Sequence, residues 1–103
     1  MMKLFLPAIA AGLVTVSAAR AEEVLPVFGN WDCGEVMGFA LDARNYNVNG
    51  QNGSVDSIEM IAADAFGVTL DDGYRFALFD VTPGSLTWHS PESGDTFDCR
   101  RQQ

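Results

Sequence analysis

The chain has 103 residues, of which 48% are hydrophobic, and its 14 acidic side chains outnumber 6 lysines and arginines to give a formal net charge of −8. This length allows one small domain, and the negative charge disfavours nucleic acid and anionic membrane surfaces as partners because both carry phosphate groups. A basic protein or a cation would instead be attracted over a Debye length of about 10 Å.

Residues 1–21 have the order of a secretory signal peptide. Lys3 precedes the apolar run 4–16, and small residues follow up to Ala21. The apolar run is shorter than the roughly 20 residues that a transmembrane helix needs. We therefore expect cleavage near Ala21 and export of a single domain, residues 22–103, to the periplasm or the medium, without a membrane span.

Two cysteines, Cys33 and Cys99, lie near the two ends of the expected mature domain. In an oxidising compartment they should form a disulfide, since neither C-x-x-C spacing nor clustered histidines indicate a redox pair or a metal site. The loop that such a bond closes spans nearly the whole domain, and its chain-entropy effect is about 4 kcal/mol.

Between the cysteines, apolar and polar residues alternate, as Phe66, Val68 and Leu70 do with their neighbours, and turn dipeptides recur. This pattern is typical of antiparallel strands that have one buried face. Residues 58–64 could instead form a helical turn, because Ala and Met favour helix. The predicted strands are residues 30–34, 38–43, 45–49, 55–62, 65–71, 74–81, 85–90 and 95–101.

The predicted turns contain glycine in a dipeptide that accepts positive φ or pre-sets a turn. Asp72-Gly73 predicts the tightest hairpin, and Asn52-Gly53-Ser54, which also fits a glycosylation sequon, is interpreted as a loop. Short connections favour pairing of sequence neighbours, so we expect an antiparallel meander. The turn dipeptides are Asn49-Gly50, Asn52-Gly53, Asp72-Gly73, Pro83-Gly84 and Ser93-Gly94.

A disulfide between Cys33 and Cys99 would bring the first strand beside the last and close the meander into an all-β barrel of 7–8 short strands. If Cys33 lies opposite Cys99 in antiparallel strands, Trp31 lies opposite Arg101 on the same face. The two side chains would then make a cation–π contact at the closure of the barrel.

The predicted interior is filled by large apolar side chains, and no internal polar group is evident that would orient a guest molecule. The inward-facing candidates are Phe39, Leu41, Val48, Ile58, Met60, Phe66, Val68, Leu70, Phe76, Leu78, Leu86, Trp88 and Phe97.

Residues 74–81 are apolar on both faces of the predicted strand. Phe79 and Val81 would either pack beneath the N-terminal stretch 24–28 or form a patch for a protein partner. With Asp71 and Asp72 they make up the candidate interaction surface. The two aspartates are interpreted as part of a turn, because the alternating oxygen ligands of a calcium loop do not follow them.

Chemistry-bearing residues are few. A nucleophile–histidine–carboxylate set would have to use His89, the one histidine of the chain, which the alternation places on an outer face. Paired carboxylates for glycoside cleavage would need a cleft, which short barrel strands hardly provide. We expect no enzymatic activity, no cofactor and no metal.

Two family resemblances bear on function. Gly29-Asn30-Trp31, together with a basic residue on the last strand, resembles the G-x-W and arginine pairing of lipocalin-type barrels. Trp31-Asp32-Cys33 and Cys99-Arg100 are similar to the ends of secreted lysozyme inhibitors of the membrane-bound C-type-inhibitor class, which are small antiparallel barrels. The Ser-Gly-x-x-Tyr inhibitory motif of that class has no mid-chain counterpart here, and residues 93–97 end in Phe97. Its inhibitory residues are therefore not carried over.

These observations lead to two functional hypotheses. The first is a monomeric, exported, non-enzymatic domain that binds a basic protein through its surface, for example as an inhibitor of a basic hydrolase such as lysozyme. The second is a lipocalin-like carrier of a small apolar molecule. A filled interior would count against the carrier.

Overall fold

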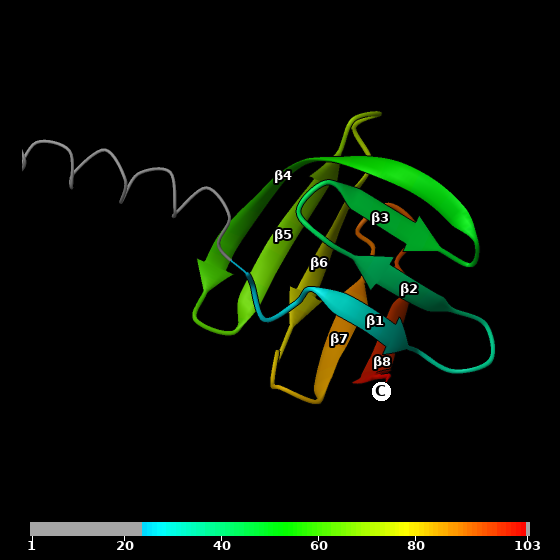
Figure 1. The fold of residues 1–103 in the computed structure, drawn as a ribbon, viewed down its shortest axis with the longest axis vertical. Helices are drawn as coiled ribbons and strands as arrows, with labels where there is room; N and C mark the ends of the chain where they lie inside the picture. The colour runs from blue at the N-terminus through cyan, green and yellow to red at the C-terminus, as the bar shows by residue number, and fades with distance from the viewer. Residues whose placement is uncertain (1–23, 103) are drawn as a thin grey trace, which may run out of the picture.

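The structure, a computed structural model, describes residues 24–102; the predicted signal peptide lies outside them. Over this range each strand pairs antiparallel with the next, and the first pairs with the last, which confirms the predicted all-β barrel (Figure 1). The described residues contain no helix that is long and apolar enough to cross a membrane. The strands are β1 (Gly29–Asp32), β2 (Gly38–Leu41), β3 (Asn45–Val48), β4 (Gln51–Ala62), β5 (Ala65–Leu70), β6 (Arg75–Phe79), β7 (Ser85–His89) and β8 (Thr96–Arg101).

Strand β4, with 12 residues, joins the two halves of the barrel. Its first residues pair with β3 and its later ones with β5, and it curves so that β1–β3 cross over β5 and β6 (Figure 1). The register of its pairing with β5 shifts between Val55 and Ser57 and again between Met60 and Ala62. Extra residues of this kind bend and twist a strand, which accounts for the curvature.

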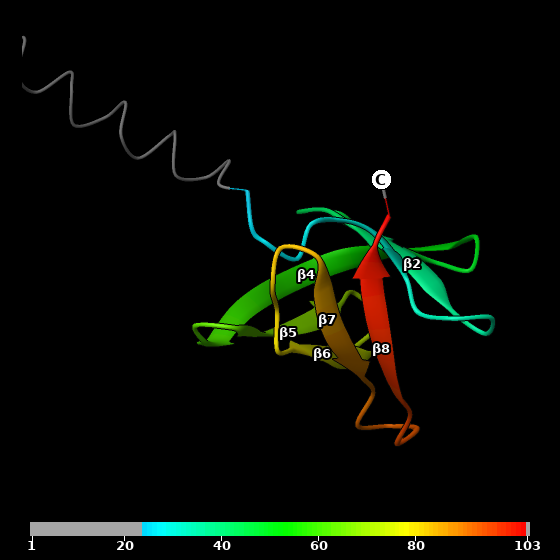
Figure 2. The same cartoon turned by 90° about the horizontal axis from the view of Figure 1, so that it is seen from below.

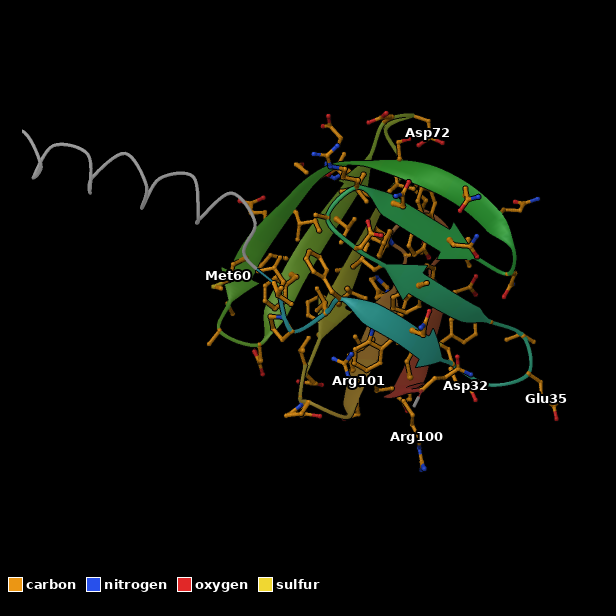
Figure 3. All side chains as sticks on the ribbon, in the orientation of Figure 1. Asp32, Glu35, Met60, Asp72, Arg100 and Arg101 are labelled. Carbon is orange, nitrogen blue, oxygen red and sulfur yellow. A yellow bond between two sulfur atoms is a disulfide. The ribbon has the colours of Figure 1, made fainter. Side chains whose placement is uncertain are left out.

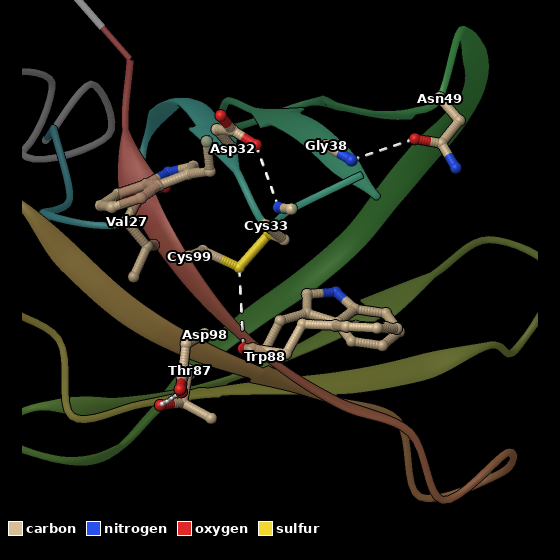
Figure 4. Close-up of a disulfide and its surroundings, with 12 residues drawn as sticks. Val27, Asp32, Cys33, Gly38, Asn49, Thr87, Trp88, Asp98 and Cys99 are labelled. Carbon is tan, nitrogen blue, oxygen red and sulfur yellow. Dashed lines mark hydrogen bonds between the residues drawn. A yellow bond between two sulfur atoms is a disulfide. The ribbon is translucent and has the colours of Figure 1, made fainter. Parts of the chain in front are cut away.

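The disulfide links the end of β1 to β8, as the position of the cysteines predicts (Figure 4). The α-carbons of Cys33 and Cys99 lie 4.0 Å apart, and Trp31 pairs with Arg101 in the adjoining register. The guanidinium carbon of Arg101 lies 4.3 Å from the centre of the Trp31 ring. The disulfide, the strand pairing and the cation–π contact thus all lie where β1 meets β8.

The barrel interior is filled by aromatic rings in succession. Phe39 lies against Tyr46, the Tyr46 ring is 4.4 Å from that of Phe76, and Phe76 lies against Trp88. Most predicted inward residues are buried, but Met60 is 62% exposed. That prediction was wrong because β4 continues past the end of β3, so Met60 has no strand on its other side to pack against.

The N-terminal stretch before β1 closes one end of the barrel (Figure 2). Val27 is fully buried, and its carbonyl oxygen accepts a hydrogen bond from Nε1 of Trp31 at 3.0 Å. Arg101 donates to the carbonyl oxygens of Pro26 and Phe28 at 2.7 and 2.8 Å. Because the last strand holds the N-terminal stretch in this way, that end of the barrel is sealed.

Two local predictions need correction, and one alternative is decided. Asn52-Gly53 is not a turn but part of β4, because Asn49 and Gly50 adopt positive φ (50° and 88°) and have already reversed the chain. Asn52 accordingly pairs with Asn47 and accepts a hydrogen bond from its side-chain amide at 2.8 Å. The strand predicted to end at residue 62 is confirmed, because β4 continues to Ala62 and a turn follows, and this excludes the helical alternative for 58–64.

The second correction concerns Val81, which lies beyond the end of β6 and not within it. Asp80 has a φ of 52°, a conformation that breaks the strand alternation. Val81 is therefore half-buried against the core while Phe79 remains on the outer face with 37% of its surface exposed. The backbone N–H of Val81 donates to the carbonyl of Asp64 at 3.0 Å.

Candidate binding site at the open end of the barrel

Within the described residues 24–102, no such plug covers the end of the barrel opposite the N-terminal stretch. Here the loop between β1 and β2, the turn between β3 and β4 and the turn between β5 and β6 surround a hollow of about 450 Å³. Volumes of this size accept small ligands or a protruding side chain of another protein. Its lining residues are Val36, Met37, Tyr46, Val48, Asn49, Gln51, Asn52, Gly53, Leu70, Asp72, Tyr74, Trp88 and Phe97.

Tyr46 and Trp88 form the floor of the hollow. Both are more than 90% buried, and Nε1 of Trp88 donates a hydrogen bond to the Tyr46 hydroxyl at 3.1 Å. Burial raises the pKa of Tyr46 well above its usual value near 10, because the phenolate would lose its hydration, although the bond from Trp88 acts in the opposite direction. The floor is therefore uncharged and has an internal polar group that the sequence pattern did not reveal.

The wall and rim combine half-buried apolar groups with polar ones. Tyr74 stands in the wall, and its hydroxyl donates to Oγ of the fully buried Ser90 at 2.9 Å. Val36 is 67% exposed on the rim, and Asp72, at the tip of the β5–β6 hairpin, contributes a carboxylate (Figure 3). Aromatic faces beside one carboxylate suit a cationic group, which both would attract.

The rim is braced by Asn49. Its Oδ1 accepts a hydrogen bond from the N–H of Gly38 at 3.0 Å, and its Nδ2 donates to the carbonyl of Val36 at 3.1 Å. The β3–β4 turn is thereby fixed to the β1–β2 loop (Figure 4). A rim held in this way loses little conformational entropy when a ligand binds.

Removal of the floor hydroxyl tests its structural contribution. We expect Tyr46→Phe to lower the free energy of unfolding by about 1–3 kcal/mol, because the indole N–H of Trp88 is left buried without an acceptor. Thermal and urea unfolding at pH 7 measure this loss. The matched control is Tyr74→Phe, which removes the hydroxyl that binds Ser90. Oγ of Ser90 still accepts a hydrogen bond from the N–H of Ser93 at 3.3 Å. The free energy of unfolding of this control should therefore fall less.

The same variant gives a pH prediction. A tyrosine whose pKa is raised on folding contributes stability that is complete below the unfolded value near 10 and is lost as the pH rises further, because only the unfolded chain ionises readily. The stability of the natural protein should therefore fall above pH 10, and that of Tyr46→Phe should fall less. Equal alkaline slopes in urea titrations from pH 8 to 11 would contradict the prediction.

The structure does not bring the four candidate interaction residues together. Asp72 lines the open end, Asp71 lies in the same turn outside the lining, and Phe79 lies on the outer face of β6 beside His89, with ring centres 6.4 Å apart. Val81 is half-buried against the core at the plugged end. Phe79 thus lies on the outer face whereas Val81 packs against the core, so the two do not share one face of a strand.

The histidine and the acidic side chains lie apart from one another in the described part of the chain. Nδ1 of His89 lies 2.9 Å from the Thr96 hydroxyl on the outer face of the barrel. Within residues 24–102, no three His, Cys, Asp or Glu side chains are grouped in a way that could hold a metal ion. The hollow at the open end has the size of a ligand-binding site.

A scan against protein-family models finds no matching family, and searches of curated proteins and of solved structures likewise return no match.

Proposed function

We propose that this chain is an exported, non-enzymatic interaction domain that receives a basic side chain of a partner protein in the hollow at the open end of the barrel. The observation that supports the proposal best is the hollow itself, in which an aromatic wall and floor lie beside the Asp72 carboxylate in a chain of net charge −8. A lysine or arginine would find both cation–π contacts and a counter-charge there.

Two further features support this proposal. The disulfide indicates an oxidising environment, which together with the expected signal peptide over residues 1–21 favours export to the periplasm or the medium. The interior is filled by aromatic rings, so the hollow is shallow and open and suits a protruding side chain better than an enclosed lipid. A basic hydrolase such as lysozyme is the partner class to test first, as an enzyme that the domain would inhibit.

The neutral substitution Asp72→Asn tests the proposed contact. Asn retains the oxygen that accepts a bond from the N–H of Tyr74 at 3.0 Å, so the turn is kept while the charge is lost. We expect about fivefold weaker association with lysozyme, measured by calorimetry at low ionic strength, because one opposite charge is worth about 1 kcal/mol.

The matched control is Asp71→Asn, which removes the same charge from the same turn outside the lining. Equal weakening by both substitutions would indicate only a long-range field and would count against the hollow as the contact site. Unchanged lysozyme activity at micromolar protein would remove the inhibitor version of the proposal.

A second candidate function is a carrier of a small ligand, which the volume of the hollow favours. The ligand would then bind at the open end against Tyr74 and Phe97 and not in the barrel centre. Native mass spectrometry of protein purified from its source would show a bound small molecule. A mass equal to that of the polypeptide alone would exclude a tightly held ligand.

A further inference from the structure

One edge of strand β4 has no neighbouring strand over more than half its length. Pairing with β3 ends at Ser54, and the N–H of Val55 donates to the carbonyl of Arg44 at 2.9 Å. From Asp56 to Ala62 the strand pairs with β5 alone, and among residues 24–102 no backbone hydrogen bond joins its other edge to another segment. Figure 1 shows this part of β4 extending beyond β3.

The free edge is open to strand addition. In an antiparallel strand alternate residues direct their N–H and C=O groups to each side, so this edge presents unpaired groups to an incoming chain. Edges are commonly protected by lysine or proline, and the segment from Asp56 to Ala62 contains neither. The two bulges of β4 bracket Ser57–Met60 but leave these four residues paired one to one with β5.

Exposed apolar side chains lie on the same part of β4, and a surface hollow lies on its β5 side. Met60 and Ile61 are 62% and 58% exposed, and Figure 3 places Met60 at the end of β4. On the outer face a hollow of about 460 Å³ extends from Glu59 and Ile61 across β5 to Arg75. Gly67 has no side chain and so leaves room for Ile61 on this face: a Cβ there would lie 3.3 Å from Cδ1 of Ile61. An added strand would lie on the other side of β4, where its outward side chains would meet those of Glu59 and Ile61.

The charge of the edge indicates what would bind. Asp56 and Glu59 lie on it and Asp64 follows in the next turn, whereas one cation, Arg44, lies at its start. In the hollow, Glu92 and Arg75 balance each other, so the edge remains acidic. A second copy would bring the same acidic edge, and antiparallel pairing centred on Glu59 would place that carboxylate opposite itself, which is unfavourable. An extended segment with basic side chains meets the opposite charge.

We propose that the free edge of β4, from Asp56 to Ala62, binds an extended, basic segment of a partner protein by strand addition. Backbone hydrogen bonds would supply affinity, and the exposed side chains of Glu59 and Ile61 would select those of the added strand. This interaction is separate from the one proposed at the open end, because the lining residues of the two hollows do not overlap.

The test uses the oxidised protein and the synthetic peptide Lys-Val-Lys-Val-Lys-Val-Lys. Binding is followed by amide chemical shifts of the isotope-labelled protein, and we expect the changes to concentrate at residues 56–62. Glu59→Lys should weaken binding about fivefold or more at low ionic strength. The matched control, Glu35→Lys, makes the same charge change on the exposed β1–β2 loop, away from this edge, and should weaken binding much less.

A second peptide, Lys-Pro-Lys-Pro-Lys-Pro-Lys, has the same charge but lacks half of the backbone donors, so it should bind far more weakly. Equal binding of the two peptides, or no binding of either at millimolar concentration, would overturn the proposal. Shift changes confined to Tyr74, Phe97 and the rest of the open end would also overturn it and would support the other site instead. Self-association of the protein in sedimentation, with concentration-dependent shift changes at residues 56–62, would also overturn the proposal. The occupant of the edge would then be a second copy of this chain.

Discussion

Replacement of both cysteines by alanine, in Cys33→Ala/Cys99→Ala, is expected to lower the free energy of unfolding by about 4 kcal/mol. The bond joins residues that are 66 positions apart, so without it the unfolded chain gains the freedom of a very long loop. Small domains commonly have about 5–15 kcal/mol of stability in total. The variant should therefore unfold at much lower urea concentration, which tryptophan fluorescence would report.

The control for this variant is the natural sequence reduced with dithiothreitol, which loses the bond without any change of side-chain volume. Both forms should unfold at similar urea concentrations. A loss of less than about 1 kcal/mol in the free energy of unfolding of either form would be no more than one hydrogen bond contributes. Packing alone would then suffice to hold β1 against β8. The predicted role of the disulfide as the main restraint of the closure would then be wrong.

The second large effect is expected at Arg101. Its guanidinium donates to the carbonyls of Pro26, Phe28 and Pro83 at 2.7, 2.8 and 2.7 Å and also covers Trp31. Charge-assisted bonds of this kind contribute more than neutral ones, so Arg101→Ala should lower the free energy of unfolding by about 3 kcal/mol. Hydrogen exchange should show faster opening of residues 24–28.

Two further variants separate geometry from charge. Arg101→Lys retains the charge but not the planar fork that reaches three carbonyls, so it should be nearly as destabilised as the alanine variant. Arg100→Ala removes a neighbouring cation that extends away from the barrel (Figure 3), and it should change stability by less than about 0.5 kcal/mol. Equal losses for Arg100→Ala and Arg101→Ala would contradict the assigned role of Arg101.

The fold could be predicted from the sequence largely because the strands alternate cleanly and the cysteines mark the closure. Phe66, Val68 and Leu70 have one buried face in the structure, as their spacing indicates. Asn52-Gly53 misled because two turn dipeptides lie three residues apart and only one reversal is possible. The register between β3 and β4, in which Val48 pairs with Gln51, decides which dipeptide forms the turn. Local turn propensity does not contain that information.

The candidate site was harder to predict. Tyr46 shares the face of Val48 two residues later, so alternation could have placed it inside, but its asparagine neighbours make the strand resemble a surface one. Val36 comes from the β1–β2 loop, and Asp72 and Tyr74 come from the β5–β6 turn. An antiparallel meander places these two connections at the same end, but which end the N-terminal stretch closes has no signature in a linear pattern.

The closure of the barrel by its two terminal strands also determines when the domain can fold. β1 and the stretch that plugs the barrel are held by Arg101, on the last strand, so the bonds at this end form only after nearly the whole polypeptide is present. Contacts between residues so distant in sequence form slowly. A chain that emerges from its N-terminus during export would therefore remain incompletely folded until β8 has crossed, and its cysteines would stay open to oxidation catalysts until that moment.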